Sequence, residues 1–358
     1  MYMISQKKCT KFIHDSNMTE WRSSREAFML QVDRVHTLSV VRYAPHRQRH
    51  TALPVIVLHG GPGGGASPKY LQVLNRRQFD VVMFDQRGCG RSTPTAGLVR
   101  NTTAHLVADI ERVRSAVRRR TADRRWDHVC VFGASFGAVL AILYAARWPG
   151  RVRCVVAHGF TRLRTFFSPK LRRVFPQLWT RLEQSVAEEE EEESRSRRKH
   201  APEAHALYTR CSRALQRGSR RTVRAWNALE GFGTQLSPTT RLRRRPPRPH
   251  RRTHTTALLE SHYAAHGSFL PKGGVPLRAV AAGVQQRPHP FPIYVVHGKD
   301  DVICDVADAR APCATVPRCH LTVVPHAGHA ISEPGVLRAL RRTLSSAAHD
   351  ATTSKIVI

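Results

Sequence analysis

Short, continuous apolar runs alternate along the chain with segments whose apolar residues recur at helical spacing. Residues 54–59 are such a run, and a glycine-rich turn ends it, which is typical of a strand buried on both faces of a parallel sheet. The same patterns predict an opening strand pair within 29–41, strands over 79–84, 128–132 and 151–157, and helices from about residue 102 and over 136–147. This alternation favours an α/β fold with a mostly parallel, doubly wound sheet.

The alternation stops near residue 160 and resumes after residue 285. The intervening sequence is helical and rich in loops, and it is followed by strands over 292–297 and 319–325 and helices over 305–312 and 334–344. We therefore expect a helical cap inserted into a sheet that later strands complete. The expected division is a flexible extension over 1–27, the first part of the core over 28–159, the cap over 160–285, the second part of the core over 286–346 and a tail over 347–358.

Two tracts of biased composition lie within the expected cap. One is the acidic run 188–193, followed by arginines, and the other is the Arg/Pro-rich stretch 241–252. Like charges repel one another, and proline disrupts a helix interior, so we expect both tracts to be solvated loops.

The charge balance is strongly basic, with 58 Lys and Arg against 26 Asp and Glu and a formal net charge of +32. Such a surplus is found in proteins that bind nucleic acids or anionic membranes, but it also arises when arginine fills solvated positions. We favour the second interpretation, and no nucleic acid or membrane is expected as a required partner. No apolar run is long enough to span a bilayer. The eight cysteines lack a disulfide or metal-ligand spacing, and no secretion signal is evident, so we expect a cytoplasmic location.

Candidate chemistry begins with the pentapeptide Gly133-Ala-Ser135-Phe-Gly137, which lies between a predicted strand and a predicted helix. In that context G-x-S-x-G forms a sharp turn that exposes the serine hydroxyl as a nucleophile. The glycines leave room for neighbouring backbone, and the helix that begins at Phe136 directs its N-terminal dipole at the serine. Alone, the pentapeptide also fits a tight turn with a solvated serine.

The glycine-rich segment 59–65 follows an earlier buried strand. In enzymes whose nucleophile lies in a G-x-S-x-G turn, this position supplies half of the oxyanion hole. We expect the backbone N–H groups of Gly61 and Phe136 to stabilise a developing oxyanion. A flexible glycine linker is the alternative, but it does not explain why the segment directly follows a buried strand.

A carboxylate and an imidazole are expected at the ends of the two strands beyond the cap, in the order Ser, Asp, His. Asp300 and Asp301 follow the first of these strands, and His326 and His329 follow the second. The residues themselves leave the choice between the two aspartates open. For the imidazole we favour His329, because the Ala-Gly before it gives its ring room to reach the serine.

These motifs resemble those of the proline iminopeptidases, serine peptidases of the α/β-hydrolase fold. The likeness extends from about Met29 to Leu344 and includes the glycine-rich turn, the segment 85–92 and the Ala-Gly-His at 327–329. The resemblance implies a catalytic triad of Ser135, Asp301 and His329. It also implies that Cys304 lies close to the substrate pocket.

Within the cap, the segments 226–231 and 258–263 resemble the family motifs that supply two glutamates to the substrate's free amine. The resemblance implies that Glu230 and Glu260 play this role here, because carboxylates hold an N-terminal ammonium through charge-assisted hydrogen bonds. Three positions depart from the family pattern where aromatic residues help to shape the proline pocket: Thr161, Leu229 and Ala264.

The expected activity is a serine aminopeptidase that releases N-terminal proline from peptides without a metal or organic cofactor. The alternatives are a hydrolase of broader specificity, such as another aminopeptidase or an esterase, and a catalytically silent binding protein of the same fold. A protein that binds RNA or membranes through its arginines is a further alternative. Composition and motifs do not predict the oligomeric state.

Overall fold

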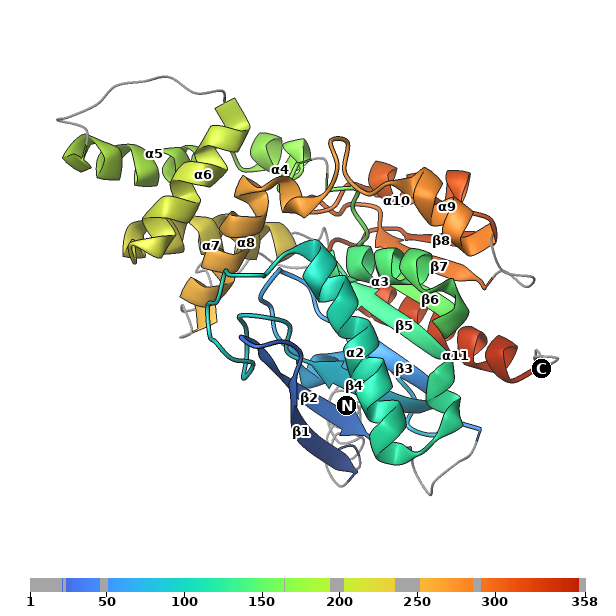
Figure 1. Ribbon diagram of the computed structural model, residues 1–358. Coiled ribbons are helices and arrows are strands. Elements are labelled where there is room, and N and C mark those ends of the chain that lie inside the picture. Colours follow the sequence, from blue (N-terminus) through green and yellow to red (C-terminus); the bar gives the residue numbers. More distant parts are fainter. Residues whose placement is uncertain are drawn as a thin grey trace, which may run out of the picture.

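The computed structural model describes residues 21, 24–45, 51–163, 165–193, 203–235, 252–285 and 291–353, and its centre is an eight-stranded twisted sheet (Figure 1). The strand order is β1-β2-β4-β3-β5-β6-β7-β8, with β1 and β2 antiparallel to their neighbours and the other pairs parallel. The strands are β1 (Arg25–Gln31), β2 (Thr37–Tyr43), β3 (Leu53–Leu58), β4 (Phe79–Phe84), β5 (Val129–Ala134), β6 (Val152–His158), β7 (Ile293–Gly298) and β8 (Cys319–Val324). The predicted fold class, an α/β-hydrolase fold, is confirmed.

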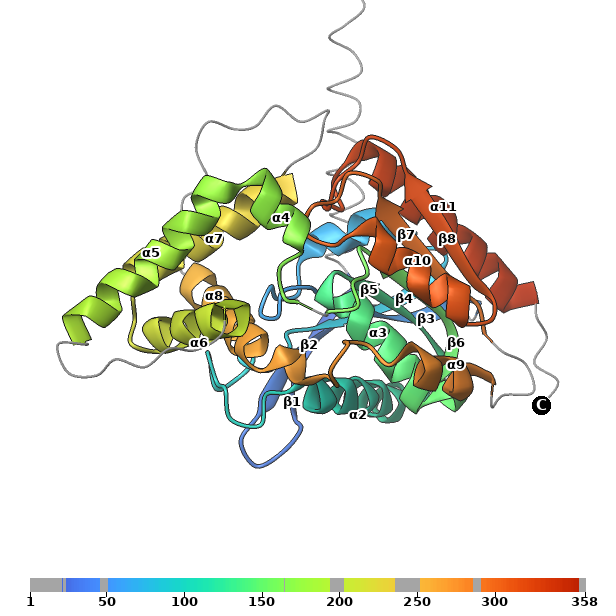
Figure 2. The same ribbon diagram turned by 90° about the horizontal axis from the view of Figure 1, so that it is seen from above.

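Helices cover both faces of the sheet, because the central strands carry apolar side chains on both sides (Figure 2). One face packs against α2 (Thr103–Thr121), α3 (Phe136–Arg147), α9 (Leu277–Gln285) and α10 (Val306–Thr315). The other packs against η2 (Pro68–Val73) and α11 (Pro334–Thr353). Short helical turns η3 (Arg124–Asp127) and η4 (Pro149–Arg151) lead into β5 and β6. Thr102 caps α2 by accepting a hydrogen bond from the His105 N–H.

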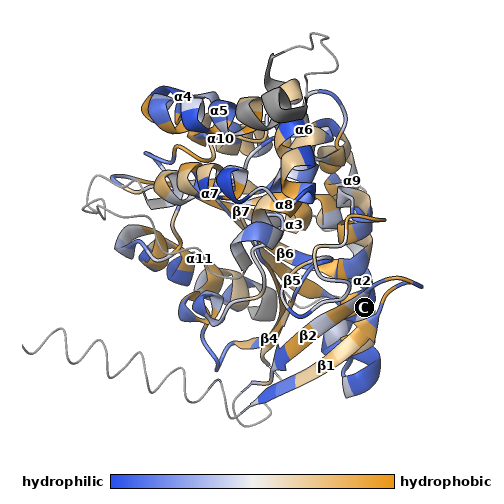
Figure 3. Cartoon of the chain, turned by 90° about the vertical axis from the view of Figure 1, so that its left-hand side faces the viewer, coloured by the Kyte–Doolittle hydropathy of each residue, from blue (hydrophilic) through white to orange (hydrophobic). Residues whose placement is uncertain are grey.

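A group of helices between β6 and β7 stands beside the sheet and carries its own apolar core. These cap helices show hydrophobic and hydrophilic stripes (Figure 3). They are α4 (Pro169–Val174), α5 (Pro176–Glu193), α6 (Glu203–Gln216), α7 (Arg220–Gln235), α8 (Arg252–Ala265) and the turn η5 (Gly267–Phe269). The helix α9, which the sequence analysis placed in the cap, packs its apolar residues against the sheet core instead.

Both ends of the described chain are more ordered than the sequence predicts. The strand β1 starts at Arg25, and Trp21 is buried against Tyr43 with 6.0 Å between ring centroids, so the expected flexible extension includes packed residues. The expected tail from residue 347 continues α11 as far as Thr353. The physical reason is that Ala347 and Ala348 continue the apolar stripe of this helix and are buried beneath the sheet.

The two biased tracts have different outcomes. The acidic run 188–193 was wrongly predicted as a loop, because it forms the last turns of α5. Glutamate has a high helix propensity, and the packed first turns of α5 provide a nucleus from which the helix extends. Residues 241–251 of the Arg/Pro-rich tract lie outside the described residues, and Arg252 begins α8.

The cysteines are mostly buried thiols, with one pair joined. Cys313 and Cys319 form a disulfide between α10 and β8, which the sequence analysis did not predict because their spacing is not a recognised motif. The free cysteines of the described chain are Cys89, Cys130, Cys154, Cys211 and Cys304. In the part of the chain that the structure describes, no helix combines the length and the apolar character that a membrane span requires.

Candidate active site

Ser135 occupies the turn between β5 and α3 in a backbone conformation that is rare for residues with a side chain, with φ 56° and ψ −124°. A Cβ atom on Gly133 would lie 2.0 Å from the Gly137 carbonyl oxygen, and one on Gly137 would lie 2.2 Å from the Leu58 carbonyl oxygen. Neither position tolerates a side chain, so the close packing of the turn accounts for both glycines. The turn thereby holds the serine at the carboxyl end of the parallel strands.

The glycine-rich turn after β3 lies directly against the serine. A Cβ on Gly60 would be 2.9 Å from the Ser135 Cβ, and Gly61, Ser135 and Phe136 line one pocket. The buried ring of His59 fixes this turn: Nδ1 donates to the Gly60 carbonyl oxygen at 2.9 Å, and Nε2 accepts the Gln86 N–H at 3.1 Å. The two expected oxyanion-hole residues therefore lie beside the nucleophile.

Asp301 and His329 meet at the ends of β7 and β8, with 2.7 Å between Asp301 Oδ2 and His329 Nδ1. The other carboxylate oxygen of the fully buried Asp301 accepts the N–H groups of Ile303 and Cys304, each at 2.9 Å. Burial alone would raise the pKa of Asp301, but the charge and hydrogen bond of His329 hold it below its usual value. Burial likewise opposes protonation of His329, yet Asp301 outweighs it and raises the pKa of His329 well above its usual value.

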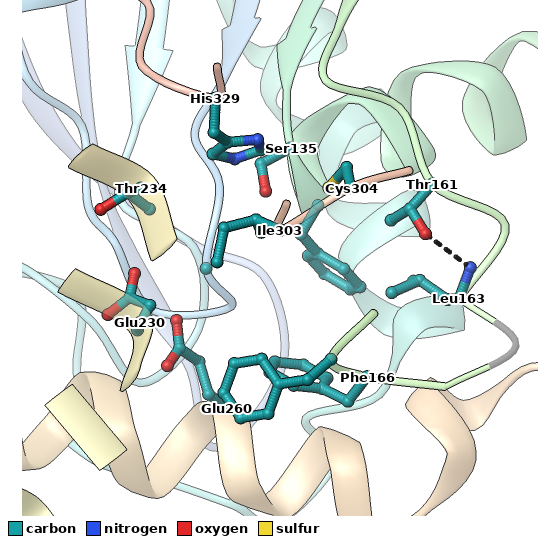
Figure 4. Close-up of a pocket in the computed structure, with 13 residues that line it drawn as sticks. Ser135, Thr161, Leu163, Phe166, Glu230, Thr234, Glu260, Ile303, Cys304 and His329 are labelled. Atoms are coloured by element: carbon teal, nitrogen blue, oxygen red, sulfur yellow. Dashed lines mark hydrogen bonds between the residues drawn. The ribbon is translucent and has the colours of Figure 1, made fainter. Parts of the chain in front are cut away.

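The structure distinguishes the alternatives that the residues left open. The backbone N–H of Asp300 donates to the Ala327 carbonyl oxygen at 2.9 Å. The carboxylate that reaches the imidazole is that of Asp301. His326 is exposed, whereas His329 lines the pocket that contains Ser135. Figure 4 shows the His329 ring beside the serine hydroxyl.

The thiol of Cys304 lies beside Asp301 and His329. The donor atoms of Asp301, Cys304 and His329 lie within 4.8 Å of one another, a set that could bind a thiophilic divalent cation. The hydrogen bond between Asp301 and His329 gives these two residues the arrangement of a general base and its orienting carboxylate. Cys304 thus lies in the pocket, as the sequence resemblance implied.

Glu230 of α7 and Glu260 of α8 extend into the pocket from the cap (Figure 4). Glu260 is 2% exposed and accepts a hydrogen bond of 2.7 Å from the Trp226 indole N–H. Burial raises the pKa of Glu230, and burial together with the charge of Glu230 raises the pKa of Glu260 well above its usual value. Among the described residues, neither carboxylate forms an ion pair, so the arrangement favours a bound cation.

Several pocket residues were not identified from the sequence. The wall between the serine and the two glutamates includes Leu163, Phe166, Phe167, Thr234 and Ile303. Of the positions that depart from the family pattern, Thr161 lines the pocket and donates to Asp308 Oδ2 at 3.0 Å. Leu229 and Ala264 are buried in the core of the cap instead. The signal that could have identified the aromatic wall is the Phe-Phe pair in the segment that follows β6.

Comparisons with known proteins identify the family of the chain. A family model described as the alpha/beta hydrolase fold matches residues 54–336. A proline iminopeptidase of Xylella fastidiosa is 33% identical over 322 residues, which cover 87% of this chain and 93% of that protein. A probable proline iminopeptidase of Leptolyngbya boryana is 31% identical, over 87% of this chain and 91% of the relative. A proline iminopeptidase of Arabidopsis thaliana is 30% identical, over 86% and 76% respectively.

Solved structures support the fold. The chain is similar to VinJ, with a TM-score of 0.58, 15% identity and coverage of 91% of this chain and 99% of that one. An esterase of Exiguobacterium antarcticum gives a TM-score of 0.56 at 15% identity, with coverage of 90% and 100%. These similarities concern the arrangement of the sheet and its helices.

Proposed function

Since the chain belongs to the proline iminopeptidase family of α/β hydrolases, we propose that it is a serine aminopeptidase that releases proline from the N-terminus of peptides. The observation that carries this proposal is the distribution of charge in one pocket. A nucleophile with its imidazole and carboxylate lies on the sheet side, and two carboxylates without a cationic partner among the described residues lie on the cap side.

Substrate binding starts from the free amine. A proline at a chain terminus carries a secondary ammonium, and Glu230 and Glu260 bind it through charge-assisted hydrogen bonds in the pocket that both line. A blocked or internal proline lacks that charge and leaves the carboxylates unpaired, so the pair selects chain ends. Phe166 and Phe167 provide the flat apolar surface against which the proline ring rests.

Acylation uses the three residues at the edge of the sheet. His329 Nε2 removes the proton from Ser135 Oγ as that oxygen attacks the prolyl carbonyl, and Asp301 keeps the proton on His329 Nδ1. The N–H groups of Gly61 and Phe136 donate to the oxyanion, assisted by the N-terminus of α3.

The second half of the reaction returns the enzyme to its starting state. The protonated His329 gives its proton to the leaving amine, and the shortened peptide departs. His329 then activates a water molecule, which hydrolyses the prolyl ester of Ser135 and releases proline. Peptides with a free N-terminal proline in the cytoplasm are the substrates that we propose, and the cap helices α4 to α8 are the unit that selects them.

A hydrolase of broader specificity is the second candidate, favoured by Thr161, a non-aromatic residue that lines the pocket. Hydrolysis of prolyl, alanyl and N-acetyl-prolyl p-nitroanilides and of p-nitrophenyl acetate separates the two. We expect the prolyl anilide to give the highest kcat/KM and the acetylated one to resist hydrolysis. Ser135→Ala should lower kcat by about 10⁴-fold or more. Equal rates with prolyl and alanyl substrates would favour the broader hydrolase.

A further inference from the structure

His329 lies on the loop between β8 and α11, so its position depends on how the backbone of this loop is held. One support is the carboxylate of Glu333, which is 8% exposed. It accepts the Gly328 N–H at 2.9 Å and the Ala330 N–H at 3.2 Å, from the residues directly before and after His329. These contacts hold the backbone of the loop on both sides of the imidazole-bearing residue.

The carbonyl oxygen of His329 has a different partner, His158, the last residue of β6. The His158 ring is buried, with Nε2 3.0 Å from the His329 carbonyl oxygen and Nδ1 3.1 Å from the Val296 carbonyl oxygen. The rings of His158 and His329 also stack, with 6.1 Å between centroids and 29° between planes. His158 therefore contacts both the backbone and the ring of His329.

The hydrogen bonding of the surroundings determines where the His158 proton lies. Burial lowers the pKa of His158 to about 4, so the ring is neutral at pH 7 and carries one N–H. The Val296 carbonyl already accepts the Gly159 N–H at 3.1 Å. For the His329 carbonyl, the ring of His158 is the donor found among the described residues. Hydrogen on Nε2 gives each carbonyl a donor, although Nδ1 then faces the Val296 oxygen as a second acceptor, whereas hydrogen on Nδ1 leaves the His329 carbonyl without a donor in the described part of the chain. We therefore assign the hydrogen to Nε2.

The backbone of the same residue holds the nucleophile. The Ser135 N–H donates to the His158 carbonyl oxygen at 2.7 Å. The next residue, Gly159, packs so closely that a Cβ there would lie 2.9 Å from His329 Cε1. The end of β6 thus connects the turn that carries Ser135 with the loop that carries His329.

We propose that His158 and Glu333 are positioning residues for His329, with His158 linking the nucleophile turn to the base loop and Glu333 holding the backbone N–H groups of the residues before and after the base. This inference rests on the proposed function, because it assigns His329 as the base that activates Ser135. Neither residue is among the residues that line the pocket. Both act on the distance and direction between the imidazole and the serine hydroxyl, on which proton transfer depends.

The test compares His158→Leu, which removes the donor, with His158→Gln, whose amide can donate to the same carbonyl. His36→Leu is the matched control, because His36 is also 1% exposed but contacts Asp33 and Arg87. The measurements are kcat and KM for prolyl p-nitroanilide, the pH profile of kcat/KM, the melting temperature and the rate at which a fluorophosphonate labels Ser135.

We expect His158→Leu to lower kcat and the labelling rate by about 10- to 100-fold, with KM unchanged. The acid limb of kcat/KM should move to lower pH, because a displaced His329 loses part of its interaction with Asp301. His158→Gln should recover most of the activity, and His36→Leu should keep it. Glu333→Gln should lower kcat in the same way, and its effect should not add fully to that of His158→Leu.

A folded His158→Leu variant with wild-type kcat and an unmoved pH profile would overturn the inference, as would activity losses that simply follow the melting temperature in all variants. Failure of the fluorophosphonate to label wild-type Ser135 would overturn the proposed function and this inference with it. Wild-type labelling without release of proline would overturn the proposed substrate. In that case the labelling rates of the variants would still test the positioning role by themselves.

Discussion

The carboxylate of Glu260 has opposite effects on folding and on binding. It is buried beside Glu230, and its pKa is raised, so the folded state holds its charge less readily than the unfolded state does. At a pH below the unfolded pKa both states are protonated and no cost arises. Above the unfolded pKa, ionising Glu260 costs more free energy in the folded state than in the unfolded state. This cost grows as the pH rises from the unfolded pKa to the folded pKa, and at neutral pH it opposes folding.

Glu260→Gln should therefore stabilise the protein near pH 7 and impair it as an aminopeptidase. We expect KM for prolyl p-nitroanilide to rise by about 10-fold or more, because a hydrogen bond to a charged group is lost. Hydrolysis of an uncharged ester should change little. Glu183→Gln, on the exposed part of α5, is the control and should leave both substrates unaffected. Equal losses for amine and ester substrates would argue against amine binding.

The pair Asp301–His329 predicts the pH dependence. Asp301 raises the pKa of His329, and only the neutral imidazole acts as a base, so kcat/KM should rise as the pH increases through that pKa. The protonated pair stabilises the fold below the unfolded histidine pKa, and this contribution is lost as the pH rises through the folded pKa.

Asp301→Asn removes the charge that raises the pKa of His329. The acid limb of the kcat/KM profile should move to lower pH, while the maximal rate falls by about 10⁴-fold because the wrong tautomer is favoured. Asp300→Asn, one residue away and without contact to His329, should keep the wild-type profile. An unmoved acid limb in Asp301→Asn would contradict the assignment of this carboxylate.

The sequence identified side chains that the structure brings together, because a motif that directly follows a buried parallel strand lies at the carboxyl edge of the sheet. Ser135, Asp301 and His329 each follow a predicted strand. Phe166 and Phe167 were missed because no motif marks them, and their place depends on how the segment after β6 packs beneath the cap.

Among the elements, α7 offers two glycines with different surroundings. A Cβ on Gly231 would meet nothing within 4 Å, whereas one on Gly233 would lie 2.5 Å from Ile303 Cδ1 and 2.7 Å from Leu171 Cδ1. Gly231→Ala should therefore increase the free energy of unfolding by about 1 kcal/mol through helix propensity.

Gly233→Ala gains the same propensity but must displace Ile303, which lines the pocket. We expect a lower melting temperature than for Gly231→Ala and a higher KM for prolyl substrates. Denaturant unfolding and steady-state kinetics on both variants provide the measurement. If the two variants are equally stable and equally active, then α7 does not pack as described.

Sheet strands were predicted well and the ends of helices poorly, for a physical reason. Buried parallel strands such as β3 and β5 need an uninterrupted apolar run, which few other structures require. A helix end depends on tertiary contacts. The last turns of α11 are held by Ala347 and Ala348, small residues that carry little signal before the sheet surface beneath them is known.

The whole molecule carries a formal net charge of +32, while the pocket is lined by the carboxylates of Glu230 and Glu260. Peptides with acidic residues after the proline should be attracted by the surrounding field, and those with basic residues repelled. We expect kcat/KM for Pro-Glu-Glu to exceed that for Pro-Lys-Lys at low ionic strength, and the difference to shrink as salt is added. If salt does not change the difference in kcat/KM between the two peptides, then local contacts and not the overall field determine the preference.

The cap helices α4 to α8 have an apolar core of their own, apart from the two cores that pack on the sheet. Such a unit can accumulate substitutions without disturbing the reacting groups, as the replacements at Leu229 and Ala264 illustrate. The repertoire of accepted peptides can therefore diverge between relatives while the bond-breaking apparatus stays the same. Grafting this insertion from a relative with another preference is accordingly a direct route to altered selectivity.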